Sequence, residues 1–502
     1  MNKIKFAFKL IIICFLFTQN VVAQVSTASI QKLDAYIEQA RQQWEAPGLA
    51  IGIVKDGKVI HAKGYGLREL GKPDPVDAKT LFAICSTTKA MTAAAMGILV
   101  DEGKIHWDDK VVQYLPAFQL YDPYVTRELR IRDLFTHNAG LGNADFLWYG
   151  SDLNSDEILQ RMRFAPPAYP FRGGYTYQNI MYLAAGKVIE EVSGMSWAQF
   201  METRLFQPIG MDNTYATQKQ SLSYKNRSIP HYKIEGKIVP IEDSDDDNIA
   251  PAGSVWSCID DMMKWTQFVL DSAKVNGKRL LKPETYAEWL KPQSIVSDAG
   301  FYPTQILTKP HWKTYALGWF QQDYNGRAVS FHTGSLAGTI AILGVIPDEK
   351  MGVYVFGNLD HAEVRHALMY KVFDVLAGQE NGRDWSTEML ALYRNLDKRA
   401  EEAEKKQLAK RAMNTKPSFP LEHYAGVYSH PFYGDATVLV KAGKLHLQRS
   451  SKQWLTLEHW HFDTFLGTWN IAWNGKTLIN FSLDEDGDVH ELNIGNQMFE
   501  KK

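Results

Sequence analysis

Apolar residues recur at the period of a helix and then at the period of strands in the first part of the chain. Between residues 30 and 44 they fall three or four positions apart, which places them on one helix face. Residues 48–66 contain two apolar runs joined by Asp56-Gly57, a strong signal for a β-hairpin. The pattern therefore predicts an N-terminal helix followed by two antiparallel strands.

A second pair of apolar runs lies far along the chain, at residues 339–346 and 351–356 around Pro347-Asp348. We expect these strands to join the first hairpin in one antiparallel sheet. Helical patterns that would cover this sheet occur at residues 86–101, 180–192, 260–272 and 362–377. The predicted fold class is α+β: an antiparallel sheet flanked by helices, with a largely helical insert between the first and last strand groups.

The character of the chain changes twice near its C-terminal end. Residues 385–413 are charged and helical in pattern, and after Pro417 short alternating runs are broken by Ala-Gly, Asn-Gly and Asp-Gly. These features predict a large domain over 24–378, a helical linker over 379–418 and a small all-β barrel over 419–502.

Composition and charge narrow the class of protein. The 502 residues are 45% hydrophobic and 22% charged, which is typical of a globular protein, and the net charge of -2 implies no bulk attraction to nucleic acid or to an anionic membrane. We therefore expect neither nucleic acid nor a membrane surface as a partner, and the sequence leaves open whether the chain forms a homo-oligomer.

The first 23 residues have the pattern of a signal peptide. Three lysines precede the apolar stretch 10–17, and Val21-Val-Ala23 precedes Gln24. The stretch is short for a membrane span, so we expect cleavage, a periplasmic or secreted protein and no stable membrane insertion. An uncleaved anchor is the alternative.

Two cysteines remain after such a cleavage, Cys85 and Cys258. A disulfide is permitted outside the cytoplasm, but Cys85 directly precedes the candidate nucleophile discussed next and should be buried, so we expect two free thiols. The His and Cys spacings indicate no metal site, and we expect no cofactor.

The strongest chemical signal is Ser86-x-x-Lys89 at the start of an Ala-rich helical run. Residues three apart share a helix face, so the Lys89 amine can reach the Ser86 hydroxyl. A lysine activates a serine only if burial lowers its pKa, and the small residues around it make burial plausible. Alone, the motif also fits a serine helix cap followed by a surface lysine.

Two later segments favour the catalytic interpretation. Tyr177-x-Asn179 precedes a helical run, so a phenol that relays protons stands close to an amide that orients a substrate. His332-Thr-Gly-Ser335 lies between strand-like runs, where it offers an imidazole, a hydroxyl and a close backbone edge. The three elements in this order favour nucleophilic catalysis at Ser86.

In this order S-x-x-K, Y-x-N and H-T-G resemble the serine β-lactamase and penicillin-binding D,D-peptidase superfamily. The class C-like group, which also holds esterases and D-aminopeptidases, is the most similar branch. Residues 134–141, 205–211 and 250–257 resemble further family stretches, so the resemblance covers about residues 27 to 375. The final domain resembles the lipocalin-like domain appended to some members.

The resemblance implies a role for each residue. Ser86 would be acylated, with Lys89 and Tyr177 sharing general-base work and Asn179 touching the substrate amide. The backbone N–H groups of Ser86 and Ser335 would form the oxyanion hole. Thr333 and Gly334 would complete the substrate-binding edge.

His332 departs from the K-T-G of β-lactamases and most D,D-peptidases. A histidine holds a substrate carboxylate only near or below its usual pKa of about 6.5. We therefore expect a neutral hydrogen-bonding imidazole, with a charged one as the alternative. We predict that the protein is an exported serine hydrolase that acts on small peptides or amides with D-amino-acid character. The alternatives are a carboxylesterase, a β-lactamase and a penicillin sensor that stays acylated.

Other features have simpler explanations. His137 is expected to be structural, and the acidic run 242–247 to be a solvated loop on the rim of the cleft. Residues 484–488 resemble the start of a calcium loop but lack its final glutamate, so we expect a hairpin turn. The aromatic-rich patch 454–469 would either fill the barrel or close over the active site.

Overall fold

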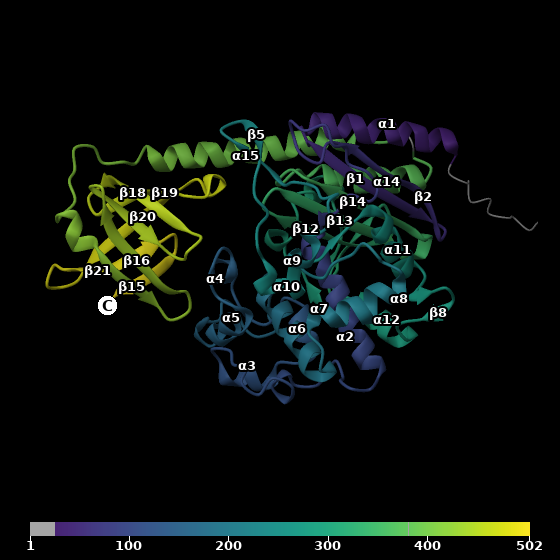
Figure 1. Cartoon of the computed structure of the whole chain (residues 1–502), viewed down its shortest axis with the longest axis horizontal. Coiled ribbons are helices and arrows are strands. Elements are labelled where there is room, and N and C mark those ends of the chain that lie inside the picture. Colours follow the sequence, from purple (N-terminus) through teal and green to yellow (C-terminus); the bar gives the residue numbers. More distant parts are fainter. Residues whose placement is uncertain (1–25, 380) are drawn as a thin grey trace, which may run out of the picture.

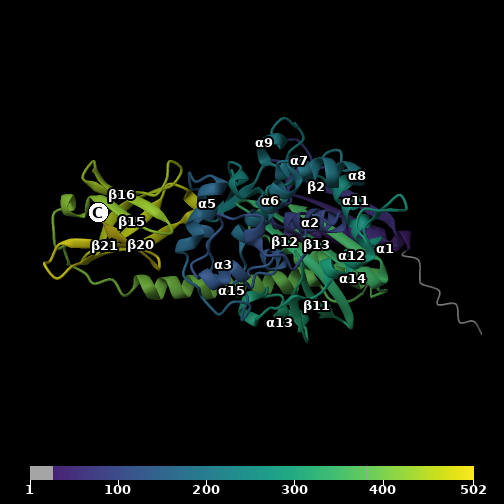
Figure 2. The same ribbon diagram turned by 90° about the horizontal axis from the view of Figure 1, so that it is seen from below.

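The computed structural model describes residues 26–379 and 381–502. In it, a large α+β domain and a small barrel are bridged by one long helix, α15 (Trp385–Leu408) (Figure 1). Seen from below, the barrel lies at one end of the molecule beside α5 (Figure 2). The predicted signal peptide, residues 1–23, lies outside the described residues.

The large domain is built on an antiparallel sheet that joins the early hairpin to the late strands, as predicted. Strand β1 (Gly48–Lys55) lies between β2 (Lys58–Gly66) and β14 (Met351–Gly357). The complete order is β2-β1-β14-β13-β12-β11-β10-β9. The remaining strands of the sheet are β13 (Thr339–Ile346), β12 (Arg327–Leu336), β11 (Phe320–Tyr324), β10 (Lys313–Tyr315) and β9 (Ser294–Ile295).

Both faces of this sheet are covered, and alternate residues of β1 enter two different cores because successive side chains point to opposite faces. Ile51 and Ile53 pack with α1 (Thr27–Gln43) and α14 (Val364–Leu376), whereas Ala50 and Val54 pack with α11 (Ile259–Leu270). Burial on two faces explains why the central strands read as nearly continuous apolar runs.

The helices near Ser86 differ from expectation in two ways. The helix expected to begin at Ser86 is α2 (Thr88–Asp101), and Ser86 itself lies in the preceding 3-10 turn η1 (Cys85–Thr87). Helix α2 packs mainly on α6 (Asn179–Ser193) inside the helical insert, and not flat on the sheet. The insert also contains α3 (Pro123–Glu128), α4 (Asp145–Trp148), α5 (Ser155–Arg161), α7 (Trp197–Phe200), α8 (Gln207–Ile209), α9 (Gln218–Ser221), α10 (Ala250–Gly253), α12 (Pro283–Leu290) and α13 (Gln305–Thr308).

Nothing in the apolar pattern predicts β9, β10 and β11, which are short and, in β11, half polar. They join the sheet by successive pairing: β11 pairs with β12, β10 with β11 and β9 with β10. The apolar pattern also does not predict three two-stranded sheets. They are β3 (Phe82–Ala83) with β6 (Trp256–Ser257), β4 (His231–Ile234) with β5 (Lys237–Pro240), and β7 (Lys274–Val275) with β8 (Lys278–Arg279).

The C-terminal strands close into a barrel, as predicted. In the patch 454–469, Leu455, Leu457 and Phe465 fill the barrel core, whereas the side chain of Trp454 is exposed. The barrel strands are β15 (Gly426–His430), β16 (Gly434–Lys441), β17 (Lys444–Gln448), β18 (Trp454–His461), β19 (Thr464–Trp469), β20 (Lys476–Leu483), β21 (Val489–Ile494) and β22 (Gln497–Lys501).

Candidate active site

Ser86 is presented by a tight turn at the end of β3. The preceding residue, Cys85, has the left-handed backbone angle φ 50°, which is unusual for a side chain with a Cβ. Strand β12 lies directly against this turn, since a Cβ added to Gly334 would meet the carbonyl oxygen of Ile84 at 2.4 Å and the amide nitrogen of Ser86 at 3.0 Å. Only glycine at 334 permits this approach.

Lys89 is completely buried, one turn after Ser86. Its Nζ donates to Ser86 Oγ at 3.0 Å, to Asn179 Oδ1 at 2.7 Å and to the carbonyl of Ala252 at 2.8 Å. Burial lowers the pKa of this amine to about 7, although the Asp145 carboxylate opposes the shift. A lysine with this pKa can take the proton of the serine hydroxyl near neutral pH.

Asn179 connects Lys89 to a carboxylate that sequence reasoning missed. While its oxygen accepts from Lys89, its Nδ2 donates to Asp145 Oδ1 at 2.8 Å. The predicted contact of Asn179 with a substrate amide stays a prediction. In this structure the side chain orients Lys89.

Tyr177 lies on the other side of the amine, with its ring centroid 4.7 Å from Lys89 Nζ. Burial raises the pKa of this phenol well above 10, although a hydrogen bond with the Ser86 hydroxyl opposes the shift. Tyr177 is therefore a neutral phenol at physiological pH. A phenol that keeps its proton can pass one on but is a poor base, so the predicted sharing of base work with Lys89 stays a prediction.

His332 is buried and neutral. Its Nδ1 lies 2.6 Å from the Thr333 carbonyl, which can only accept, so Nδ1 carries the proton and Nε2 accepts from the Tyr315 hydroxyl at 2.8 Å. Burial and the nearby Lys89 lower its pKa to about 3. The alternative of a charged imidazole is thereby disfavoured, and the hydrogen-bond partners of the neutral ring are the Tyr315 hydroxyl and the Thr333 carbonyl.

A buried ion pair supports the end of β12. Arg365 pairs with Glu363 at 2.7 Å and donates to the Gly334 carbonyl and, at 2.8 Å, to Ser335 Oγ. Although burial opposes it, the Arg365 guanidinium keeps the pKa of Glu363 well below its usual range. Thr333 is likewise held, with its hydroxyl 2.5 Å from that of Tyr302. Protein groups thus fix the predicted substrate-binding edge.

The secondary expectations have mixed outcomes. His137 packs beneath Tyr177 with ring centroids 4.3 Å apart and accepts from the Gln178 amide, a structural arrangement as expected. Cys85 and Cys258 are buried free thiols. The prediction that residues 242–247 form a fully solvated loop is wrong, because Asp246 is buried and burial raises the pKa of its carboxyl to about 6.

Asp484 forms a turn, as expected. Its carboxylate accepts from the amides of Asp486 and Asp488, between β20 and β21.

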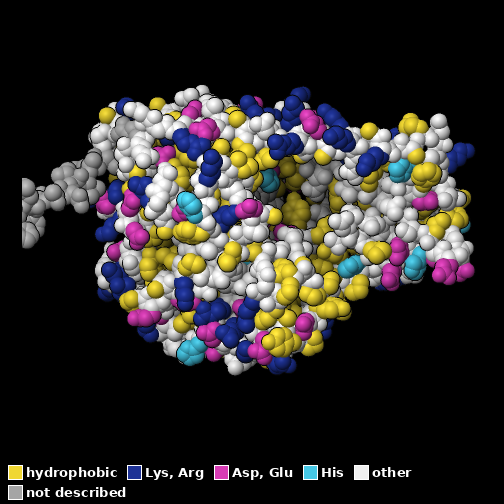
Figure 3. All heavy atoms as spheres, turned by 180° about the vertical axis from the view of Figure 1, so that it is seen from behind, with side chains coloured by type: hydrophobic (Ala, Val, Ile, Leu, Met, Phe, Trp, Pro, Cys, Tyr) yellow, Lys and Arg dark blue, Asp and Glu magenta, His cyan; other side chains and the backbone are white. Residues whose placement is uncertain are grey.

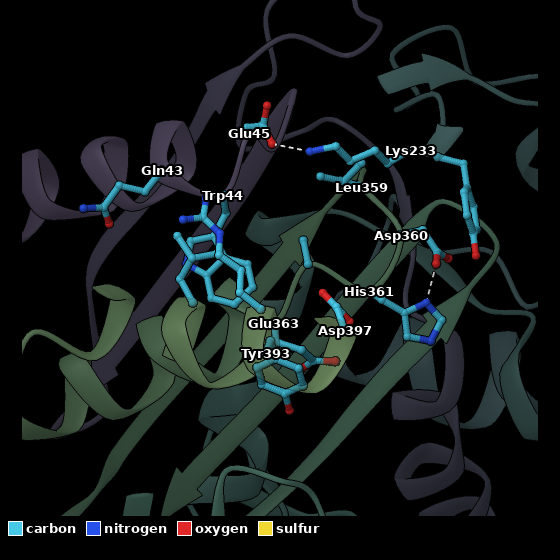
Figure 4. A pocket seen from close by; sticks show the side chains of 14 residues that line it. Gln43, Trp44, Glu45, Lys233, Leu359, Asp360, His361, Glu363, Tyr393 and Asp397 are labelled. Carbon is cyan, nitrogen blue, oxygen red and sulfur yellow. Dashed lines mark hydrogen bonds and ion pairs between the residues drawn. The ribbon is translucent and has the colours of Figure 1, made fainter. Parts of the chain in front are cut away.

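A pocket of about 520 Å³ lies beside α15, and Ser86 is not among the residues that line it (Figure 4). Its walls include Trp44 and Tyr393, together with an ion pair of 2.6 Å between Glu45 and Lys233. Glu363 lines this pocket and pairs with Arg365, so the pocket lies behind the strand end that carries Gly334 and Ser335.

Sequence reasoning missed Asp145, Tyr315, Arg365 and the Ala252 carbonyl. Ala252 lies in the stretch 250–257 already noted as a family-like motif, so a signal existed for it. The others carry no local signature, because their roles arise from contacts with residues distant in the chain.

Comparison with known proteins gives two matched regions. Residues 33–377 match the family described as Beta-lactamase, and residues 410–502 match a Domain of unknown function (DUF3471). Unguisins hydrolase ungD of Aspergillus violaceofuscus is 28% identical over 497 residues, which is 91% of this chain and 86% of that protein. Protein flp of Staphylococcus aureus is 25% identical over 350 residues, 67% of this chain and 64% of that protein.

Solved structures share the fold over nearly the whole chain. The octameric penicillin-binding protein homologue from Pyrococcus abyssi superposes with a TM-score of 0.61 at 20% identity, covering 94% of this chain and all of that one. SurE superposes with a TM-score of 0.57 at 18% identity, covering 95% of this chain and 99% of that one. With the family match spanning most of the large domain, the chain belongs to the beta-lactamase family of hydrolases.

Proposed function

We propose that this protein is a serine hydrolase that forms an acyl-enzyme on Ser86 and releases product to water. The observation that carries the proposal is the buried Lys89 amine, 3.0 Å from Ser86 Oγ, whose pKa of about 7 leaves it partly neutral at physiological pH. A base of this kind is what a serine needs in order to attack a carbonyl.

In the first half-reaction Ser86 Oγ bonds to the substrate carbonyl carbon and its proton passes to Lys89 Nζ. The tetrahedral oxyanion would be held by the backbone N–H groups of Ser86 and Ser335. The carbon–nitrogen or carbon–oxygen bond to the leaving group then breaks, and the leaving group takes the proton through the neutral Tyr177 hydroxyl. In the second half-reaction water attacks the acyl carbon, with the same groups transferring its proton. The bond to Ser86 Oγ then breaks, which frees the acid and restores the Ser86 hydroxyl.

The substrates we propose are small peptides or amides with D-amino-acid character. Where β-lactamases of the K-T-G type have a lysine that holds a substrate carboxylate, this chain has a neutral His332. The absence of a permanent cation at this position disfavours penicillins as the natural substrate. The relative named Unguisins hydrolase supports a hydrolytic role, and the structure of SurE with D-Leu suggests D-leucyl amides as probes. A carboxylic ester is the second candidate.

The test is turnover by wild type and Ser86→Ala of a D-leucyl anilide, a D-alanyl anilide, a chromogenic ester and a penicillin. We expect multiple turnovers of an amide by wild type, none by Ser86→Ala, and wild-type activity in Ser223→Ala, which removes an exposed serine hydroxyl. Intact-protein mass spectrometry would show the acyl-enzyme. Persistent acylation without turnover would instead indicate a sensor, and penicillin turnover far above the rest would indicate a β-lactamase.

Export and assembly are proposed separately. None of the helices within 26–379 and 381–502 is both long and apolar enough to span a membrane. N-terminal sequencing of the mature protein would test cleavage after Ala23. Light scattering would test a homo-oligomer, which the octameric homologue from Pyrococcus abyssi suggests.

A further inference from the structure

The barrel contacts one segment of the large domain, residues 143–153, through its loop 449–453. Ser450 Oγ donates to the Gly150 carbonyl at 2.7 Å, and the amide of Ser451 donates to Asp152 at 2.6 Å. The loop also packs so tightly that a Cβ at Gly150 would lie 2.2 Å from the side-chain nitrogen of Gln453. The surface between barrel and large domain is hollowed (Figure 3).

Arg449 makes the most specific of these contacts. Its guanidinium lies over the Phe146 ring, 3.2 Å from the centroid, and donates to the Phe146 carbonyl at 2.8 Å and to Gln453 Oε1 at 2.9 Å. Its side chain is half-buried, no ion pair with a carboxylate is found for it among the described residues, and burial lowers its pKa. Phe146 also packs edge-on against Tyr433 of the barrel, with centroids 5.2 Å apart.

The residue before Phe146 is Asp145, whose carboxylate accepts from Asn179 Nδ2 at 2.8 Å and from Trp148 Nε1 at 2.8 Å. Asn179 in turn accepts from Lys89 at 2.7 Å. A continuous path of contacts therefore runs from the barrel to the amine beside Ser86. A barrel that served only as a solvated appendage would not need a half-buried cation at this position.

We propose that Arg449 is a positioning residue for the Ser86 site: by holding the Phe146 main chain, it keeps the Asp145 carboxylate on Asn179 and so keeps Lys89 aimed at Ser86. The proposal rests on the proposed function. The barrel then acts as a brace for the catalytic amine, and it supplies no group that touches the substrate.

The brace should affect both the rate and the protonation of Lys89. Asp145 favours the charged amine, so displacing it lowers the pKa of Lys89 and moves the acid limb of the pH–rate profile to lower pH. The same displacement loosens Asn179, which lowers the plateau rate. The ionisable groups that face Lys89 are Asp145, Cys85, Tyr177, Tyr182, His137 and His332.

The experiment is the pH dependence of Ser86 acylation in full-length Arg449→Met, Arg449→Lys and Asp145→Asn. Arg411→Met is the matched control, because Arg411 also lies over an aromatic ring, that of Trp460 at 4.4 Å, and donates to a barrel carbonyl, but is exposed and distant from Asp145. Asp145→Asn calibrates the direction of the shift.

We expect Arg449→Met to lower the plateau on the order of tenfold and to move the acid limb in the direction of Asp145→Asn. Arg449→Lys should fall between Arg449→Met and wild type, and Arg411→Met should match wild type. A lowered plateau with an unmoved limb, or a profile equal to that of Arg411→Met, would overturn the proposal.

Two controls keep the outcomes separable. If Arg449→Met does not fold, as judged by circular dichroism, the same criteria apply to Arg449→Lys, and a wild-type profile there refutes the brace. If Ser86→Ala keeps wild-type activity, the proposed function fails instead, whatever the Arg449 variants do.

Discussion

The pH dependence of acylation should report the protonation of Lys89 alone. Its pKa of about 7 means that the neutral fraction rises from about one-tenth at pH 6 to about nine-tenths at pH 8. Acylation of Ser86 should therefore increase about tenfold over this range as a single titration. The rise is toward high pH because the neutral amine is the base.

The other two ionisable candidates do not titrate in this window. Burial holds the pKa of His332 at about 3 and that of Tyr177 well above 10, so both are neutral from pH 5 to 9. A profile with a second inflection between these limits would mean that one of them has a different environment from that described.

The assay is stopped-flow acylation with a chromogenic ester under single-turnover conditions from pH 5 to 9. Lys89→Arg serves as the control, because a guanidinium cannot lose its proton at these pH values and should abolish the pH-dependent rate. An acylation rate that is constant or falls from pH 6 to 8 would refute Lys89 as the base, even if Ser86 is still labelled.

Three further changes probe the surroundings of Ser86. Gly334→Ala should lower acylation about a hundredfold, since its Cβ would displace the turn that carries Ser86; labelling of Ser86 by an acylating probe measures this. His332→Lys should cost about 3 kcal/mol or more of unfolding free energy by placing a cation without a carboxylate partner beside Lys89, as measured by urea unfolding, with no gain in penicillin turnover. The unfolding free energy of wild type, measured relative to that of Lys89→Met, should rise between the folded Lys89 pKa of about 7 and its unfolded value of 10.5. The slope should reach about 1.4 kcal/mol per pH unit, because the unfolded state holds the Lys89 proton more tightly. Urea unfolding at pH 7 and pH 9 tests the sign.

Local pattern was sufficient for elements whose character is set by neighbours in sequence. The hairpin around Asp56-Gly57 and the pairing of β13 with β14 could be predicted because turn chemistry and apolar runs are local signals. Strands β9 to β11 could not be predicted, since they are short and owe their extended form to pairing with one another and, through β11, with β12. Helix α2 begins two residues later than the pattern predicts, because Cys85 has a left-handed backbone angle and residues 85–87 form a 3-10 turn.

The same division runs through the candidate site. The sequence by itself singled out Ser86, Lys89, Tyr177, Asn179 and His332 as candidates, because three short motifs with fixed spacings carry them. Their protonation states came only from the tertiary structure, since a pKa depends on how completely the fold removes water from a group. Burial lowers the pKa of Lys89 to about 7, keeps Tyr177 a neutral phenol and keeps His332 uncharged.

The tertiary structure alone also brought Asp145 and Arg365 to the site, and it brought Arg449 to the Phe146 main chain. Asp145 lies 34 residues from Asn179 along the chain, and Arg449 belongs to a different domain from the Phe146 carbonyl it holds, 303 residues away. Contacts over such separations leave no periodic trace in a single sequence, because neither residue constrains its own neighbours. They form only when the sheet, the helical insert and the barrel have packed together.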